Sequence, residues 1–230
     1  MQSWPVRHHA PVFQKVPDCD HIFYVPNAVT PEKSKYLMHM IDNVPNSKWK
    51  ILKNRKLQMY GGTPSEKGMI SEKMPSWLTD LIDEMSAIVD KMDVEKYNVS
   101  DLGVPTKFIK PNHALINDYQ PGQGIMPHKD GPLYNPVILT LSLGSAEFEH
   151  FTHDEDKTCR KTVILEENSL IVIFGDMYER FLHHIEEGVI DEKCDSGLNF
   201  SEKVEIEKKR RVSLTLRYVP KVRKNPFRFK

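Results

Sequence analysis

The second half of the chain alternates apolar and polar residues in short runs, and this period of two is typical of β-strands. Such runs cover residues 113–119, 137–144, 147–151, 162–165, 169–174, 180–185 and 211–219, and turn residues separate them, as in QPGQG and EEN. No helical pattern lies between these runs. The pattern therefore excludes a doubly wound parallel sheet and favours an antiparallel sandwich or jelly roll.

The first 93 residues carry helical patterns instead. Thr30 and Pro31 are typical of an N-cap and a first-turn proline, and the segment EKSKYLMHMIDNV follows them. Between Trp77 and Met92 the apolar positions recur at helical spacing and form one stripe, which we interpret as core packing. The sequence predicts one α+β domain, mainly β, over residues 1–230, with a helical region at 1–93, a β core at 94–219 and a basic tail at 220–230.

Composition limits the classes of protein to which this chain can belong. The chain has 230 residues, with 32 lysines and arginines against 32 aspartates and glutamates, so overall charge alone would not hold it to nucleic acid. Its three cysteines are scattered and form no CxxC pair, so the sequence indicates neither a disulfide framework nor a zinc knuckle and favours a reducing compartment. We find no signal peptide and no membrane-spanning apolar run, and we expect a soluble, intracellular protein.

The segment GIMPHKDGP, residues 124–132, holds a histidine and an aspartate with one residue between them. In extended backbone the residues i and i+2 point to the same side, so His128 and Asp130 can offer an imidazole and a carboxylate to one common atom. That combination suits a metal ion. An isolated HxD triplet is also common in surface turns, so the hypothesis depends on partners elsewhere in the chain.

The segment RVSLTLR places Arg211, Ser213, Thr215 and Arg217 on one face of a strand and apolar residues on the other. If the polar face is solvated, this is an ordinary half-buried strand. If it faces a barrel interior, the two arginines need anionic partners. A dicarboxylate ligand would supply one carboxylate for each guanidinium.

Two further segments can contribute to the same site. RFLHHI contains His183 and His184, and two histidines with one carboxylate form the facial triad of non-haem Fe(II) oxygenases. In HALINDY, Asn117 and Tyr119 lie at i and i+2, and both side chains can donate hydrogen bonds to a carboxylate or a keto acid.

In this order, the motifs NxY, HxD, a later histidine and RxSxTxR resemble those of the AlkB family of Fe(II)/2-oxoglutarate-dependent dioxygenases. The stretches KLQMYGG, GQGIMPHKDGPLYNP, LSLGS, RFLH and RVSLTLRYVP extend the resemblance from about residue 20 to about residue 220. The resemblance implies a double-stranded β-helix, or jelly roll, with the N-terminal helices packed on the sheet. This fold agrees with the strand pattern.

The resemblance also implies roles for individual side chains. The ligands of Fe(II) would be His128, Asp130 and His183. The co-substrate 2-oxoglutarate would be held by Asn117, Tyr119, Arg211 and Arg217, with Ser213 lining the same pocket. His183 is preferred to His184, and the alternation of RFLHHI puts the two rings on opposite faces, so only one can be a ligand.

The implied activity is oxidative demethylation of alkylated DNA or RNA, in which Fe(II), 2-oxoglutarate and O2 hydroxylate an N-methyl carbon and formaldehyde leaves. Two residues depart from the family pattern. Ser213 stands where much of the family has asparagine, and Leu133 and Tyr134 follow HxD where several nucleic-acid demethylases carry an acidic residue. The second departure puts base recognition by a carboxylate in doubt.

Residues 48–60 correspond to the family's lid over the substrate and combine basic charge with aromatic rings. The candidate substrate contacts are Lys53, Arg55, Lys56 and Tyr60. Such a segment suits single-stranded nucleic acid or a flipped base, although a solvated basic loop has the same composition. We expect the protein in the cytoplasm and the nucleus, away from membranes.

Other interpretations remain open at this point. The substrate could be a methylated protein side chain, or the jelly roll could be a non-catalytic nucleic-acid-binding module. Two histidines and a carboxylate also hold zinc in hydrolases, but water activation on zinc needs no paired arginines. His150, His153 and Asp154 in EHFTHDEDK are interpreted as a solvated charged turn, and His8 and His9 as part of an untethered terminus.

Overall fold

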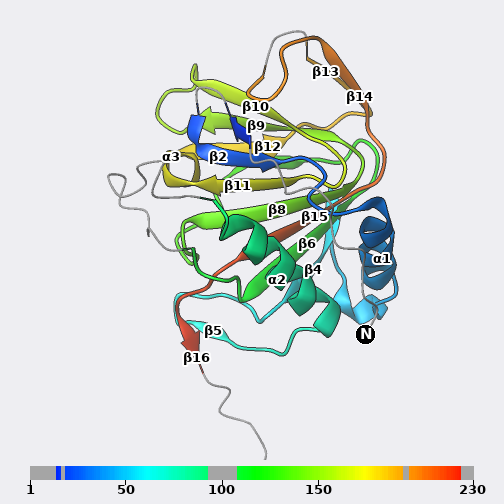
Figure 1. The fold of residues 1–230 in the computed structure, drawn as a ribbon, viewed down its shortest axis with the longest axis vertical. Helices are drawn as coiled ribbons and strands as arrows, with labels where there is room; N and C mark the ends of the chain where they lie inside the picture. Colours follow the sequence, from blue (N-terminus) through cyan, green and yellow to red (C-terminus); the bar gives the residue numbers. More distant parts are fainter. Residues whose placement is uncertain (1–13, 17–18, 93–107, 194–196, 224–230) are drawn as a thin grey trace, which may run out of the picture.

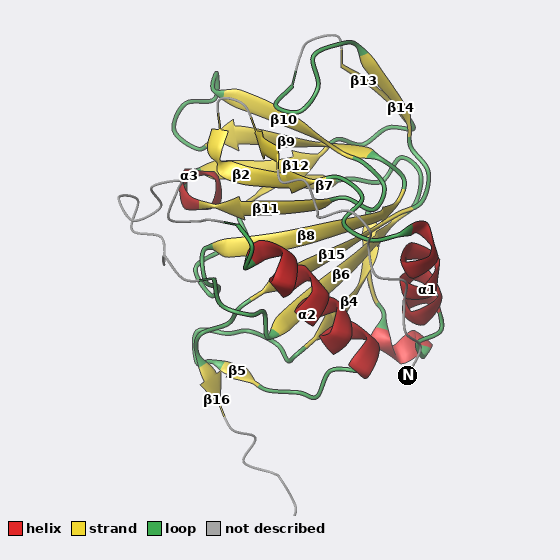
Figure 2. Cartoon of the chain, in the orientation of Figure 1, coloured by secondary structure: helices red, strands yellow, loops and turns green. Residues whose placement is uncertain are grey.

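The computed structural model describes residues 14–16, 19–92, 108–193 and 197–223. They form three layers, with two helices on one face of a large antiparallel sheet and a smaller antiparallel sheet on its other face (Figure 1, Figure 2). The predicted jelly roll with helices packed on the sheet is therefore confirmed.

The large sheet has eight strands among the described residues, in the order β1, β2, β11, β8, β15, β6, β4 and β3. Their bounds are β1 Gln14–Val16, β2 Cys19–Val25, β11 Leu170–Phe174, β8 Val137–Gly144, β15 Arg211–Arg217, β6 His113–Tyr119, β4 Arg55–Tyr60 and β3 Lys50–Leu52. The small sheet has the order β10 (Arg160–Leu165), β9 (Glu147–His153), β12 (Phe181–Ile185) and β7 (Ile125–His128). The short helix α3 (Gly175–Glu179) leads from β11 to β12.

Both predicted helices form. Helix α1 covers Pro31–Asp42, and its N-cap Thr30 accepts a hydrogen bond from the backbone N–H of Lys33 at 3.2 Å. Helix α2 covers Ser76–Val89 and buries its apolar stripe. The first core joins these helices to the large sheet, with Leu37, Leu81, Leu141 and Leu214 among its members. This core covers the apolar face of β15.

A second core lies between the two sheets. It contains Ile22 and Ile171 from the large sheet and Phe151 and Val163 from the small one. With a layer packed on each side, all seven residues of β15 are buried, including its polar face. The interpretation of RVSLTLR as a half-solvated surface strand is therefore wrong.

The end of β8 brings backbone close to the start of β15. Gly144 pairs in register with Arg211 and has a φ of +85°, a conformation that favours glycine. A Cβ at this position would collide with the carbonyl oxygen of Arg210. The glycine thus lets the strand that carries the arginines pair closely with β8.

The sequence pattern missed the strands in the first half of the chain. Besides its helices, this half contains β1 to β4, the 3₁₀ turn η1 (Asn46–Lys48) and β5 (Met69–Ile70). Strand β4 joins the large sheet through backbone pairing with β6, which does not require an alternating apolar pattern. The predicted change of character near residue 94 lies outside the described residues.

Two small ribbons complete the described chain. The basic tail begins with β16 (Val222–Arg223), which pairs in parallel with β5, whereas residues 224–230 lie outside the described part. Before β15, the strands β13 (Ile190–Lys193) and β14 (Val204–Glu207) pair in antiparallel orientation. Neither ribbon belongs to the two main sheets.

Candidate functional site

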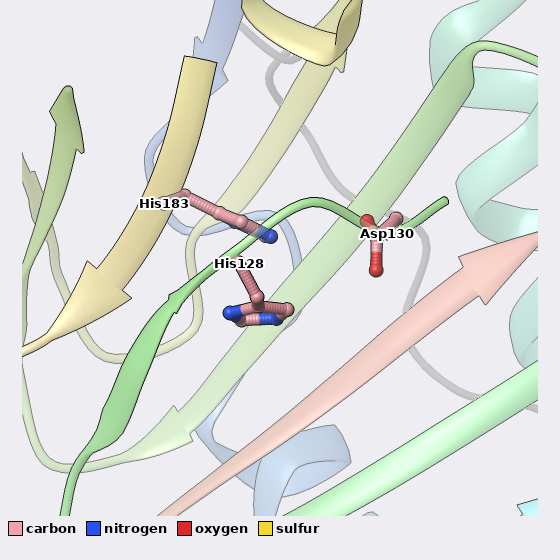
Figure 3. A group of neighbouring side chains, drawn as sticks. All are labelled: His128, Asp130 and His183. Carbon is pink, nitrogen blue, oxygen red and sulfur yellow. The ribbon is translucent and has the colours of Figure 1, made fainter. Parts of the chain in front are cut away.

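The small sheet brings His128 and His183 side by side. His128 ends β7, His183 lies in β12, and the two residues pair directly across the ladder. Their ring centroids are 4.3 Å apart. Asp130 follows β7 after one residue, and the possible ligand atoms of all three side chains lie within 4.8 Å of one another (Figure 3). The structure therefore groups the three expected iron ligands around one point.

The Nδ1 nitrogen of each imidazole has a hydrogen-bond partner, which leaves Nε2 as the possible metal ligand. The Nδ1 of His128 lies 2.9 Å from the carbonyl oxygen of Met126, and the Nδ1 of His183 lies 2.9 Å from Oε1 of Glu149. Both partners are acceptors, so in the neutral imidazoles each Nδ1 carries the hydrogen and each Nε2 keeps its lone pair. This arrangement is typical of metal-binding histidines.

The two rings differ electrostatically. Burial, followed by the neighbouring His183, lowers the pKa of His128. Burial also lowers the pKa of His183, but the hydrogen bond and the charge of Glu149 outweigh it, so the net shift is upward. His184 faces the other side of β12, with its ring 5.1 Å from that of His150. It is not one of the three grouped side chains.

The polar face of β15 points between the sheets toward this group. Arg217, which is 6% exposed, donates to Oδ1 of Asp130, and its guanidinium lies 4.7 Å from the ring centroid of Tyr134. One of the two arginines therefore already has a carboxylate partner. By holding one oxygen of Asp130, it also fixes the orientation of a candidate metal ligand.

Arg211 has no such carboxylate partner within the described part of the chain. It is 4% exposed, and one of its terminal nitrogens donates to the hydroxyl of Ser142 at 2.9 Å. Among the described residues no carboxylate lies within ion-pair distance of it, and its buried Nε has no hydrogen-bond acceptor. A buried guanidinium without a counter-ion needs an anion to offset its desolvation. The carboxylate of a small dicarboxylic acid fits this requirement.

Strand β6 adds neutral hydrogen-bonding groups beside Arg211. Asn117 pairs with Ser213 and Tyr119 pairs with Arg211 across the ladder. The ring centroid of Tyr119 lies 5.8 Å from the guanidinium of Arg211. Burial raises the pKa of Tyr119, so its hydroxyl remains a hydrogen-bond donor at neutral pH. The expected co-substrate residues thus share one face of two adjacent strands, β6 and β15.

The structure separates the four expected substrate contacts. Arg55 lies on the site face of β4, and its Nε donates to Oδ1 of Asn117 at 3.0 Å, while Lys53 is exposed at the β3–β4 turn. Lys56 alternates to the opposite face and pairs with Asp118 at 3.2 Å. The buried Tyr60 also faces the helices and packs against Trp77. The prediction that Lys56 and Tyr60 contact the substrate is therefore not supported by their positions.

Sequence reasoning missed three polar residues around the site: Ser142, Glu149 and His113. Ser142 is the polar residue in the alternation of β8 that matches Ser213 in β15, so its position was readable from the pattern. Glu149 is a charged residue on the inward face of β9, which is also a recognisable departure from an apolar pattern. His113 is fully buried opposite Arg217, and burial, followed by the charge of Arg217, lowers its pKa to about 4.

A second set of possible metal ligands, His150, Glu186 and Asp191, lies outside this site. The ammonium of Lys208 is 3.5 Å from Asp191 and 3.0 Å from Glu147, so positive charge is already present there. A turn forms after His153 as expected, with His153 Nδ1 accepting the backbone N–H groups of Glu155 and Asp156. The interpretation of His150 as part of a solvated turn is wrong, because His150 lies within β9 and is only 7% exposed. Neither arrangement points to a second metal.

Comparison with known proteins agrees with this geometry. Residues 15–217 match the 2OG-Fe(II) oxygenase superfamily, and the chain belongs to that family. It is thus an oxidoreductase, which decides against the zinc hydrolase and against a purely non-catalytic module.

The chain is further an AlkB-like oxygenase. It is 31% identical over 217 residues to the "Probable RNA/DNA demethylase ALKBH6" of Danio rerio, covering 87% of this chain and 86% of that protein. The likeness to alkB homologue 6 suggested by KLQMYGG and GQGIMPHKDGPLYNP is thereby confirmed. The "Uncharacterized protein L905" of Acanthamoeba polyphaga mimivirus is 30% identical over 199 residues, covering 84% of this chain and 82% of that protein.

A solved structure shows the same fold. "The structure of OsALKBH1" aligns with a TM-score of 0.58 at 12% identity, covering 90% of this chain and all of that one. Within the part of the chain that the structure describes, no helix is long and apolar enough to cross a membrane.

Proposed function

We propose that this protein removes N-alkyl groups from DNA or RNA by oxidation, using Fe(II), 2-oxoglutarate and O2, and that it does so in the cytoplasm and the nucleus. The observation that carries the chemistry is the grouping of His128, Asp130 and His183 beside Arg211, a buried cation that lacks a counter-ion among the described residues. Three ligands with open positions suit Fe(II), and the unpaired guanidinium suits a carboxylate.

The residues divide into two groups by what they hold. Nε2 of His128, Nε2 of His183 and the oxygen of Asp130 not bound by Arg217 would hold Fe(II). Arg211 would bind a carboxylate of 2-oxoglutarate through its fork of donors. Asn117, Tyr119 and Ser213 would complete the polar lining, and Arg217 would act mainly through Asp130.

When bound, Fe(II) with 2-oxoglutarate and O2 supplies the oxidation of an N-methyl carbon, yielding succinate, CO2 and a hydroxymethyl product that releases formaldehyde. The chain itself orients the metal ligands and excludes water from the site. Arg217 fixes Asp130, the Nδ1 partners fix both imidazoles, and the two sheets exclude bulk water from the polar face of β15.

Two features support a nucleic-acid substrate. The β3–β4 hairpin presents the exposed Lys53 and, on the site face, Arg55, so a cationic group lies beside Asn117, one of the expected co-substrate residues. The Danio rerio relative is named a probable RNA/DNA demethylase. Because the metal-binding group is partly buried, an alkylated base would have to leave a stack to reach it, so single-stranded or flipped-base nucleic acid is the favoured form.

The test is 2-oxoglutarate turnover by anaerobically iron-loaded protein with methylated DNA, RNA and peptide pools. We expect succinate and formaldehyde in equal amounts with a nucleic-acid pool, and loss of both in His128→Ala and Arg211→Ala. Stimulation by the peptide pool instead would replace the nucleic-acid substrate with a protein one. Absence of succinate in every pool, from protein that binds 2-oxoglutarate, would contradict the demethylase function.

A further inference from the structure

Glu149 lies inside the site although no motif of the sequence points to it. It projects from β9 on the same face as Phe151, which pairs with His183 across the ladder. Its Oε1 is 2.9 Å from Nδ1 of His183, and the residue is 9% exposed. Its other oxygen, Oε2, is buried and has no hydrogen-bond partner within the described residues. Burial of this carboxylate is unfavourable because it is desolvated, so an interaction at the site must offset that cost.

The contact gives His183 a different partner from that of His128. The Nδ1–H of His128 donates to a neutral backbone carbonyl, whereas the Nδ1–H of His183 donates to a carboxylate. A carboxylate makes a stronger, charge-assisted hydrogen bond and increases the electron density at the opposite ring nitrogen. The imidazole of His183 is therefore held in one orientation and one tautomer, with Nε2 directed toward His128 and Asp130.

We infer that Glu149 is a positioning residue of the metal site, which orients His183 and strengthens its Nε2 as a ligand. The inference rests on the role of His183 as a metal ligand under the proposed function. Loss of such a carboxylate partner typically weakens metal affinity by about 10- to 100-fold. The effect would be on metal binding first, and on turnover only as a consequence.

The experiment measures binding of Co(II) alone to the metal-free full chain, by calorimetry and by the visible absorption bands of Co(II). Glu149→Ala removes the acceptor, and we expect it to weaken Co(II) affinity by about 100-fold and to shift the absorption bands. Glu149→Gln keeps an amide oxygen that still accepts from Nδ1–H, so we expect a loss of about tenfold and bands close to those of the wild type.

Glu147→Gln is the matched control. Glu147 lies two residues earlier on β9, is also buried, and pairs with Lys208 at 3.0 Å, not with a histidine. We expect this variant to be less stable to urea but to bind Co(II) with wild-type affinity and absorption. A merely structural role for Glu149 would make the Glu149 and Glu147 variants behave alike.

His183→Ala separates this inference from the proposed function. If that variant binds Co(II) as the wild type does, then the metal site itself is wrong. If it loses Co(II) while both Glu149 variants keep wild-type affinity and bands, the role of Glu149 is refuted and the site stands. Should Glu149→Ala fail to fold, the isosteric Glu149→Gln decides, since wild-type affinity in it would overturn the inference.

Discussion

Replacing Arg211 with alanine tests whether this side chain binds 2-oxoglutarate. Arg211 is 4% exposed and has only the Ser142 hydroxyl as a hydrogen-bond acceptor among the described residues. A forked guanidinium–carboxylate contact consists of two charge-assisted hydrogen bonds, each worth at least about 1.5 kcal/mol. Their loss amounts to about 3 to 4 kcal/mol, which corresponds to about 10²- to 10³-fold in the Kd for 2-oxoglutarate.

The assay is calorimetric titration of 2-oxoglutarate into protein loaded with Mn(II), so that binding is measured without turnover. Arg210→Ala is the control, because Arg210 is the adjacent residue but binds Asp118 and Asp42 on the helix side of the sheet. We expect Arg210→Ala to lower stability and to leave the Kd for 2-oxoglutarate unchanged.

The same structure predicts an opposite effect of Arg211 on the fold. Because Arg211 is buried and no carboxylate among the described residues lies within ion-pair distance of it, Arg211→Met should leave the free energy of unfolding unchanged or raise it by about 1 kcal/mol or more. Urea denaturation without 2-oxoglutarate measures this.

For the binding experiment, wild-type affinity for 2-oxoglutarate in Arg211→Ala, or an equal loss of affinity in Arg210→Ala, would refute the role of Arg211 in binding the co-substrate.

Three further predictions concern stability and substrate contact. Asp118→Asn should destabilise the fold by about 3 kcal/mol in urea denaturation with no change in Co(II) affinity, since Asp118 is fully buried and pairs with Arg210 and Lys56. Burial depresses the pKa of His113 to about 4, so as pH falls this imidazole takes up a proton in the unfolded chain before it does so in the folded one. The free energy of unfolding should therefore fall by up to about 3 kcal/mol as pH drops from about 6.5 to about 4. His113→Phe should flatten that pH dependence, and an unchanged slope would assign it to other groups. Lys53→Ala should weaken binding of single-stranded oligonucleotides, measured by fluorescence anisotropy, and should reduce the slope of log affinity against log salt concentration by about 1. Lys56→Ala should lower stability only, because Lys56 pairs with Asp118. The reverse pattern in the anisotropy measurement would contradict the orientation of β4.

Much of the site was predictable because it depends on local spacing. The separation of His128 and Asp130 by one residue, and the alternation along RVSLTLR, are properties of extended backbone that hold in any sheet. The same alternation placed His183 and His184 on opposite faces, which the structure bears out. The strands at 113–119 and 137–144 coincide with β6 and β8 for the same reason.

Only the tertiary structure decided what covers each face. Alternation shows that two faces of a strand differ, but the second sheet, distant in sequence, is what buries the polar face of β15. Likewise, the basic segment 48–60 was readable as charge and aromatic rings, but pairing of β4 with β6 directs Lys56 and Tyr60 toward the helices and Arg55 toward the site.

The chain by itself therefore determined the residue types and their spacing, since these follow from backbone geometry. The pairing of Arg217 with Asp130 and the contact of Glu149 with His183 join residues 34 or more positions apart. Such contacts depend on sheet register and packing, which no local pattern specifies.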